Sequence, residues 1–169
     1  PLIKYIIDDW RHAGIGNFKI VCAPEYLQKI KTSLNGNDHQ FFVQKKPLGM
    51  ADGVLSAKID ENKPLIIING EDLLESGTGI DFLKKEKKTK GEVLLTGLYL
   101  KKYFPGGYFK LKGKEITGLI EKPGQGKEPS RFVNIVLHYF KDPSLFLKYL
   151  KNTKAIKDDA YEAALDMMI

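Results

Sequence analysis

Apolar residues recur along the chain with two different spacings, one typical of helices and one typical of strands. Over residues 2–13 they follow at intervals of three and four, which places them on one face of a helix that ends at Gly14. Over residues 64–69 an unbroken apolar run predicts a strand in a sheet that is covered on both faces. The same reasoning predicts further helices over 24–34, 50–59, 79–88, 143–151 and 158–169. Further strands are expected over 17–23, 40–44, 92–100, 107–113, 115–122 and 131–140.

Strands and helices alternate through most of the chain, and the second half is richer in strands. This order predicts an α/β fold with a mostly parallel sheet between helical layers. The chain has 169 residues, of which 43% are hydrophobic, and this is enough for one sizeable core. We therefore expect a single domain over 1–169. Locally, Thr78 is expected to cap the helix over 79–88.

Composition narrows the class of protein. The formal net charge of +6 favours anionic ligands such as phosphates. The basic run over 84–90 lacks interleaved aromatic residues, so no nucleic-acid partner is expected. The single cysteine, Cys22, excludes an internal disulfide. No apolar run approaches the roughly 18 residues that span a bilayer. Together these two observations predict a soluble cytoplasmic protein with no membrane partner. The three histidines show no ligand spacing and argue against a zinc site: His12, His39 and His138.

Three loops that follow predicted strands carry glycines and polar groups. They are QKKPLGMADG at 44–53, NGEDLLESGTG at 69–79 and EKPGQGKEPS at 121–130. In α/β sheets, ligands bind beyond the carboxyl ends of the strands. Because loops on a rigid sheet can present polar groups to a ligand, these three are the predicted binding loops.

Five motifs, in this order along nearly the whole chain, resemble those of the sugar-phosphate nucleotidyltransferases, the family of glucose-1-phosphate thymidylyl- and uridylyltransferases. PLIKYIIDDWRHAGIGNFKIV is similar to the family's first helix and strand. QKKPLGMAD fits its Gln-x-x-Pro-x-Gly-x-Ala pattern, and IIINGED its apolar strand that ends in Gly-Asp. EITGLIEKP resembles its Glu-Lys-Pro strand, and SRFVNIVLHYF its Ser-x-x-x-Asn strand.

The resemblance implies both a fold and a reaction. The fold is a three-layer α/β/α Rossmann-like domain of the nucleotide-diphospho-sugar transferase type, with a mixed, mostly parallel sheet. In the reaction, a phosphate oxygen of a sugar 1-phosphate attacks the α-phosphorus of a nucleoside triphosphate, which releases pyrophosphate and leaves a nucleotide sugar. The expected partners are dTTP or UTP and a sugar 1-phosphate, and the expected cofactor is Mg²⁺, because charge spreads over the phosphoryl oxygens.

The first loop is expected to bind the nucleotide through residues that match the family pattern: Gln44, Pro47, Gly49 and Asp52. The amide of Gln44 carries a donor and an acceptor that suit the edge of a pyrimidine base. Gly49 lets the backbone approach that base closely. The alternatives are a polar strand end at Gln44, a turn glycine at Gly49 and a helix-start carboxylate at Asp52.

Glu71 stands where the family has its metal-binding aspartate, and Asp72 is next to it. The resemblance therefore implies a catalytic and metal-binding role for Glu71, shared with Asp72, although two solvated loop carboxylates are the alternative. The family's second metal carboxylate lies in a helix near the end of the comparable region, where Ala163 aligns. Asp159 is the expected substitute in a neighbouring turn, with Asp158 and Glu162 as the other candidates. The alternative is that these acidic residues only complement the dipole of the helix that they begin.

The third loop is expected to bind the sugar phosphate. In the family, the lysine of Glu-Lys-Pro reaches the phosphate and the glutamate bonds sugar hydroxyls, which assigns Lys122 as catalytic and Glu121 as sugar-binding. Gly107 and Asn134 complete the predicted sugar-phosphate site. The alternative for Glu121 and Lys122 is an exposed ion pair at a strand end. Two positions of the strand over 131–140 depart from the family, which usually has glycine and tyrosine there: Val136 and His138.

The family's Gly-rich phosphate loop belongs before residue 1, and family members continue beyond residue 169. We therefore expect the sequence to be a domain truncated at both ends. A second hypothesis is a non-catalytic nucleotidyltransferase-like subunit with a regulatory or assembly role. Glu71, Val136 and Ala163 favour that alternative. The base, the sugar and the oligomeric state, including a homo-oligomer, stay open.

Overall fold

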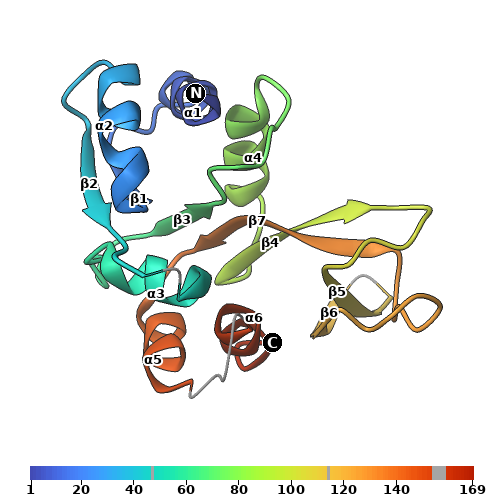
Figure 1. Cartoon of the computed structure of the whole chain (residues 1–169). Helices are drawn as coiled ribbons and strands as arrows, with labels where there is room; N and C mark the ends of the chain where they lie inside the picture. The colour runs from blue at the N-terminus through green and yellow to red at the C-terminus, as the bar shows by residue number, and fades with distance from the viewer. Residues whose placement is uncertain (47, 114, 154–158) are drawn as a thin grey trace. The chain divides into compact units, whose positions relative to one another are not determined.

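The computed structural model describes residues 1–46, 48–113, 115–153 and 159–169 (Figure 1). The helices are α1 (Leu2–His12), α2 (Pro24–Ser33), α3 (Gly49–Ser56), α4 (Thr78–Glu86), α5 (Ser144–Asn152) and α6 (Ala160–Asp166). The strands are β1 (Phe18–Cys22), β2 (His39–Val43), β3 (Leu65–Ile68), β4 (Val93–Tyr99), β5 (Gly107–Lys112), β6 (Glu115–Glu121) and β7 (Phe132–Phe140). The described chain forms two compact units. The first unit comprises 1–48, 52–59 and 69–91, and the second comprises 49–51, 60–68 and 92–169.

The predicted helices and strands are found in their predicted places, and the mixed α/β class is confirmed. The prediction of a mostly parallel sheet is wrong. Among the strand pairs of the described residues, β1 and β2 are parallel, whereas every pair of the five-stranded sheet is antiparallel. An apolar run shows that a strand is buried but does not fix its direction, because direction is set by the neighbours with which the strand pairs.

The first unit is built around an apolar cluster in which α1 and β1 meet. Ile7 of α1 and Ile20 of β1 are buried with Leu34, and four partly buried apolar residues pack against them: Ile3, Phe18, Ile30 and Phe41. Trp10 is also buried, and its ring meets Phe82 of α4 edge to face at 5.8 Å between centroids. The helical face predicted for residues 2–13 is therefore the face that packs.

Helix α4 begins with a cap supplied by α1. The carboxylate of Asp9 accepts hydrogen bonds from the backbone N–H groups of Gly77 and Gly79, at 2.5 and 2.9 Å. These two groups have no partner within the helix, so the carboxylate satisfies them and also complements the helix dipole. The prediction that Thr78 caps this helix is wrong, because its hydroxyl donates to the backbone carbonyl of Glu75 instead.

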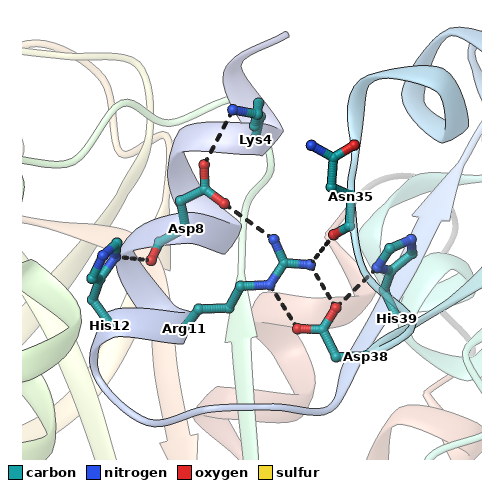
Figure 2. Close-up of polar contacts among 7 residues, drawn as sticks. All are labelled: Lys4, Asp8, Arg11, His12, Asn35, Asp38 and His39. Atoms are coloured by element: carbon teal, nitrogen blue, oxygen red, sulfur yellow. Dashed lines mark hydrogen bonds and ion pairs between the residues drawn. The ribbon is translucent and has the colours of Figure 1, made fainter.

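Arg11 joins the end of α1 to the segment that enters β2 (Figure 2). Its guanidinium donates two hydrogen bonds to the Asp38 carboxylate, from Nε at 2.6 Å and from Nη2 at 2.5 Å. It also donates to Asp8 at 3.1 Å and to the Asn35 carbonyl at 2.6 Å. The bidentate bond to Arg11 holds the pKa of Asp38 well below its usual range, and a further bond from His39 acts in the same direction.

Strand β7 is the centre of the sheet in the second unit. Its C-terminal half pairs with β3, and β4 pairs with it from Phe132 to Phe140. At Val133 it also pairs with β5, which in turn pairs with β6. A strand with neighbours on both sides has its backbone groups satisfied by the sheet. Val133, Leu137, His138 and Phe140 are all buried.

Helices α5 and α6 pack beside β7 in the same unit. Phe146 of α5 stacks on Phe140 with ring centroids 4.3 Å apart, and it meets Tyr161 of α6 edge to face at 5.3 Å. The side chain of Asp166 accepts a hydrogen bond from the backbone N–H of Leu119 in β6 at 2.7 Å. These contacts fix α6 against the sheet.

Cys22 is half-buried, and its partial burial raises the pKa of the thiol. Within the described part of the chain, the helices are all too short or too polar to cross a membrane. The single domain predicted over 1–169 stays a prediction.

Replacing Asp38 with Asn should lower the stability of the protein. Because the pKa of Asp38 is depressed in the folded state, its contribution is present above its ordinary pKa of about 4 and is lost as pH falls below that value. The urea midpoint of the native protein should therefore decline below about pH 4 more steeply than that of D38N.

The exposed pair Lys84–Asp81 provides the matched control, because solvent-exposed pairs contribute little. D81N should leave the urea midpoint nearly unchanged at neutral pH. Equal losses in D38N and D81N would contradict the role given to the Arg11–Asp38 pair.

Candidate functional site

Glu121 and Gly107 face each other where β6 ends and β5 begins. They are direct partners in the antiparallel register. A Cβ atom on Gly107 would lie 2.9 Å from Oε2 of Glu121, closer than real Cβ atoms approach. Glycine at 107 therefore gives the carboxylate of Glu121 its room beside the strand.

Asn134 lies beside the same pair. Its Cβ is 3.6 Å from the position that a Cβ on Gly107 would take, and its backbone pairs with Gly97 of β4. Its side chain is half-buried. Three of the predicted sugar-phosphate residues, from three different strands, are thus brought together at one end of the sheet.

Lys122 follows directly and has an unusual backbone. Its φ of 42° lies in the left-handed region, which a residue with a side chain rarely adopts. Its N–H donates to the carbonyl of Gly106 at 3.2 Å, and its Nζ lies 3.4 Å from Oε1 of Glu121. The side chain is 58% exposed, against 22% for Glu121. A strained residue with an exposed amine at a strand end is typical of functional sites.

The predicted nucleotide residues lie around the end of β2 and the start of α3. Gln44 follows β2, and its amide nitrogen donates to Oδ2 of Asp52 at 3.0 Å. Asp52 is in the first turn of α3, where a carboxylate is favoured by the helix dipole. Gly49 begins the helix with a φ of 84°, which only glycine adopts without strain. Pro47 lies outside the described residues.

The predicted metal residues supply carboxylate oxygens, but the described residues do not surround a metal position on all sides. Glu71 is exposed and Asp72 is half-buried in the turn that follows β3. Their backbone N–H groups donate to the side chain and the carbonyl of Asn69, at 3.3 and 3.4 Å. Asp159 precedes α6. Among the described residues, no three His, Cys, Asp or Glu side chains gather as a metal site. Two hard carboxylates suit Mg²⁺ that is bound mainly by substrate phosphates.

A buried polar pair, His138 and Tyr161, lies next to Asn134, and the spacing of the histidines along the chain does not indicate it. Nε2 of His138 is 2.8 Å from Oδ1 of Asn134, and Nδ1 is 2.8 Å from the hydroxyl of Tyr161. Burial lowers the pKa of His138 to about 3, opposed by the carbonyl of Ile135, so the imidazole is neutral at pH 7. The spacing of four along a strand places His138 and Asn134 on one face, and this signal was available in the sequence.

The predicted residues divide between the two units. The first unit holds Gln44, Asp52, Glu71 and Asp72. The second holds Gly49, Gly107, Glu121, Lys122, Asn134 and Asp159. Within the second unit, the structure brings Gly107, Glu121, Lys122 and Asn134 together. The functions assigned to all of these residues stay predictions.

Known proteins resemble the chain in sequence and in fold. A family model described as nucleotidyl transferase matches residues 1–168. Over 80 residues the chain is 34% identical to "Probable UDP-N-acetylglucosamine pyrophosphorylase" of Acanthamoeba polyphaga mimivirus, a region that covers 45% of this chain and 31% of the relative. The chain thus spans about a third of the length of that curated relative.

Two solved structures share the fold. One is a UDP-glucose pyrophosphorylase complexed with UDP-glucose, with a TM-score of 0.83, 16% identity and coverage of 99% of this chain and 74% of that chain. The other, from Bacillus anthracis and in complex with sucrose, is described as a "Putative Glucose-1-Phosphate Thymidylyltransferase", with a TM-score of 0.77, 16% identity and coverage of 96% of this chain and 65% of that chain. At these identities the likeness shows the fold alone.

The backbone strain at Lys122 can be measured by comparing two variants that both remove the amine. Glycine adopts a positive φ without steric cost, whereas alanine does not, so K122G should be more stable than K122A by about 1 kcal/mol. Chemical unfolding measures this difference. If K122A equals or exceeds K122G in stability, the left-handed conformation of residue 122 is contradicted.

Proposed function

We propose an activity for a chain that belongs to the nucleotidyl transferase family: the transfer of a uridylyl group from UTP to a sugar 1-phosphate, with release of pyrophosphate. The observation that carries the proposal is the group formed by Gly107, Glu121, Lys122 and Asn134, which joins a cation, an acceptor and an amide at strand ends. This group has the chemistry that a sugar 1-phosphate requires.

Lys122 would bind the phosphate of the sugar. Its ammonium is a compact charge on a flexible stem, and its exposed position lets it meet an incoming anion. Its contact with Glu121 is partly solvated, so a phosphate can compete for it at small cost. The strain at residue 122 is consistent with a lysine placed for function rather than for stability.

Glu121 and Gly107 would receive the sugar. An ionised carboxylate accepts hydrogen bonds and donates none, so Glu121 recognises hydroxyl hydrogens. Charge-assisted bonds of this kind are stronger than neutral ones. The missing side chain at Gly107 leaves the carboxylate accessible beside the strand. Both residues come from paired strands, which limits their movement relative to each other.

In the first unit, Gln44 would recognise the base. Its amide nitrogen donates to Asp52, which fixes the orientation of the amide. The carbonyl oxygen is then the atom that would accept a hydrogen bond from the base. A carbonyl acceptor matches the N3–H donor that uracil and thymine share. The mimivirus relative, named as an enzyme of a UDP-sugar, supports uracil.

Mg²⁺ is the cofactor that this chemistry calls for, and Glu71 and Asp72 are the residues that would hold it. When bound, it neutralises the charge of the triphosphate oxygens. Glutamate reaches one methylene further than the family's aspartate, and Asp72 offers a second oxygen ligand next to it. The contribution of Asp159 stays a prediction.

The reaction is a single exchange of P–O bonds. A phosphate oxygen of the sugar 1-phosphate forms a bond to the α-phosphorus, and the bond from that phosphorus to the bridging oxygen of pyrophosphate breaks. No proton has to be removed from the attacking oxygen, because the phosphate is already ionised. The protein's contribution is therefore to position the two anions and to neutralise their mutual repulsion.

A second candidate is a non-catalytic nucleotidyltransferase-like subunit. Glu71 in place of aspartate favours it, and so does Val136, which is half-buried on the face of β7 that carries Asn134 and His138. Such a subunit would not form a nucleotide sugar. The cytoplasmic location and a homo-oligomer also stay predictions.

Replacing Lys122 with Ala in the intact protein should lower kcat/KM for the sugar 1-phosphate by at least about 100-fold, because a positioned cation is removed from the phosphate. Release of pyrophosphate measures the rate. K127A is the matched control, since Lys127 is an exposed lysine of the same loop, and its rate should stay within about twofold. An unchanged rate in K122A, or an equal loss in K127A, would contradict the role of Lys122.

A further inference from the structure

Three polar side chains form a line from the interior of the second unit to the candidate sugar-phosphate site. Tyr161 of α6 and His138 of β7 are both fully buried. Asn134, four residues before His138, is half-buried and lies beside Gly107. The two hydrogen bonds that join the three residues are each 2.8 Å long. The rings of His138 and Tyr161 lie nearly parallel, with an angle of 18° between them.

The direction of each hydrogen bond follows from the tyrosine. Within the described residues, the hydroxyl of Tyr161 has one hydrogen-bond partner, Nδ1 of His138. A buried O–H that does not donate is costly, so the hydroxyl donates to Nδ1. Its phenol stays protonated, because burial raises the pKa of Tyr161 well above its usual value. Nδ1 is then an acceptor, and the single proton of the neutral imidazole is on Nε2.

The same logic continues to Asn134. An Nε2–H group donates, so the atom of the amide that faces His138 is the carbonyl oxygen Oδ1. The NH₂ group of Asn134 consequently points away from the histidine. Reversing the amide would set two donors against each other across 2.8 Å, and a reversal that also moved the proton to Nδ1 would leave the tyrosine hydrogen without an acceptor.

We propose that Tyr161 and His138 are positioning residues that hold the amide of Asn134 with its NH₂ group directed at the sugar, where it donates a hydrogen bond to a hydroxyl oxygen. This inference rests on the proposed function. It assigns the two sides of the site opposite tasks: Glu121 accepts from the sugar and Asn134 donates to it. A vicinal pair of sugar hydroxyls satisfies both, since each hydroxyl is a donor and an acceptor.

The hydrogen-bonded chain from Tyr161 through His138 to Asn134, here called the relay, can be tested without any ligand. Nitrogen NMR of histidine-labelled protein at neutral pH distinguishes a protonated Nε2 from a protonated Nδ1. The relay predicts protonated Nε2 at His138, and a loss of that fixed preference in Y161F, which keeps the ring but removes the donor. Protonated Nδ1 in the native protein would overturn the relay, whether or not the protein binds a sugar phosphate.

The effect on the ligand is tested by a double-mutant cycle. Calorimetry and steady-state kinetics with glucose 1-phosphate and N-acetylglucosamine 1-phosphate supply the affinities, KM and kcat. Y161F and N134A should each weaken binding about 5-fold and raise KM by a similar factor, with kcat changed less than about twofold. Combining them should add nothing to N134A alone, because Tyr161 acts through Asn134. Y99F, an exposed tyrosine of β4, should bind like the native protein.

The outcomes distinguish the positioning role of Tyr161 and His138 from the proposed function. If Y161F weakens binding equally in the native and N134A backgrounds, its effect is structural and the positioning role is overturned. If the native protein binds neither sugar phosphate, the proposed function and the donor role of Asn134 fail together, while the NMR result still decides the orientation of the relay. Protonated Nε2 together with a non-additive cycle supports the proposal in full.

Discussion

Pairing of β7 with neighbours on both sides is the constraint on which the second unit depends. β3 pairs with its last residues, β4 pairs with it from Phe132 to Phe140, and β5 joins it at Val133. Because side chains alternate along a strand, a shift of one residue would exchange its two faces. The face with Asn134, His138 and Phe140 would then exchange places with the face of Val133 and Leu137. The register therefore fixes both the packing of α5 and α6 and the position of Asn134.

The same strand explains why a histidine is tolerated in the interior. Burying a polar side chain is unfavourable unless its hydrogen bonds are made. His138 has a partner on each ring nitrogen, and its lowered pKa keeps it uncharged. The structure thus maintains a buried polar line that ends at a candidate site, beside a lysine with a strained backbone. The strained backbone costs stability locally, and both features lie next to the residues that we assign to the sugar phosphate.

The sequence predicted the elements well because their periodicity is local. The face of α1 is an example in which spacing alone identifies the packing side. Strand direction was not predictable in this way, because it depends on partners far along the chain. The cap of α4 shows the same limit: Thr78 was the local candidate, whereas Asp9, about seventy residues earlier, is the actual acceptor.

In the candidate site, too, some features were predictable from the sequence and others depend on contacts that only the folded chain makes. Motif order predicted the group of Gly107, Glu121, Lys122 and Asn134, and the strand register brings these residues together. It did not predict the strain at Lys122, which is a property of the folded backbone. Tyr161 was also missed, because only the packing of α6 against β7 places its hydroxyl on His138. Local patterns thus identify candidate groups, and tertiary contacts determine how those groups are oriented.

The proposed function requires that the intact protein make a nucleotide sugar. The direct measurement is mass spectrometry of reactions that contain UTP or dTTP, glucose 1-phosphate or N-acetylglucosamine 1-phosphate, and either Mg²⁺ or a chelator. We predict a UDP-sugar and an equal amount of pyrophosphate with UTP and Mg²⁺, and no product with the chelator. A protein that binds UTP and a sugar 1-phosphate but forms no nucleotide sugar in any mixture would contradict the claim and favour a non-catalytic subunit.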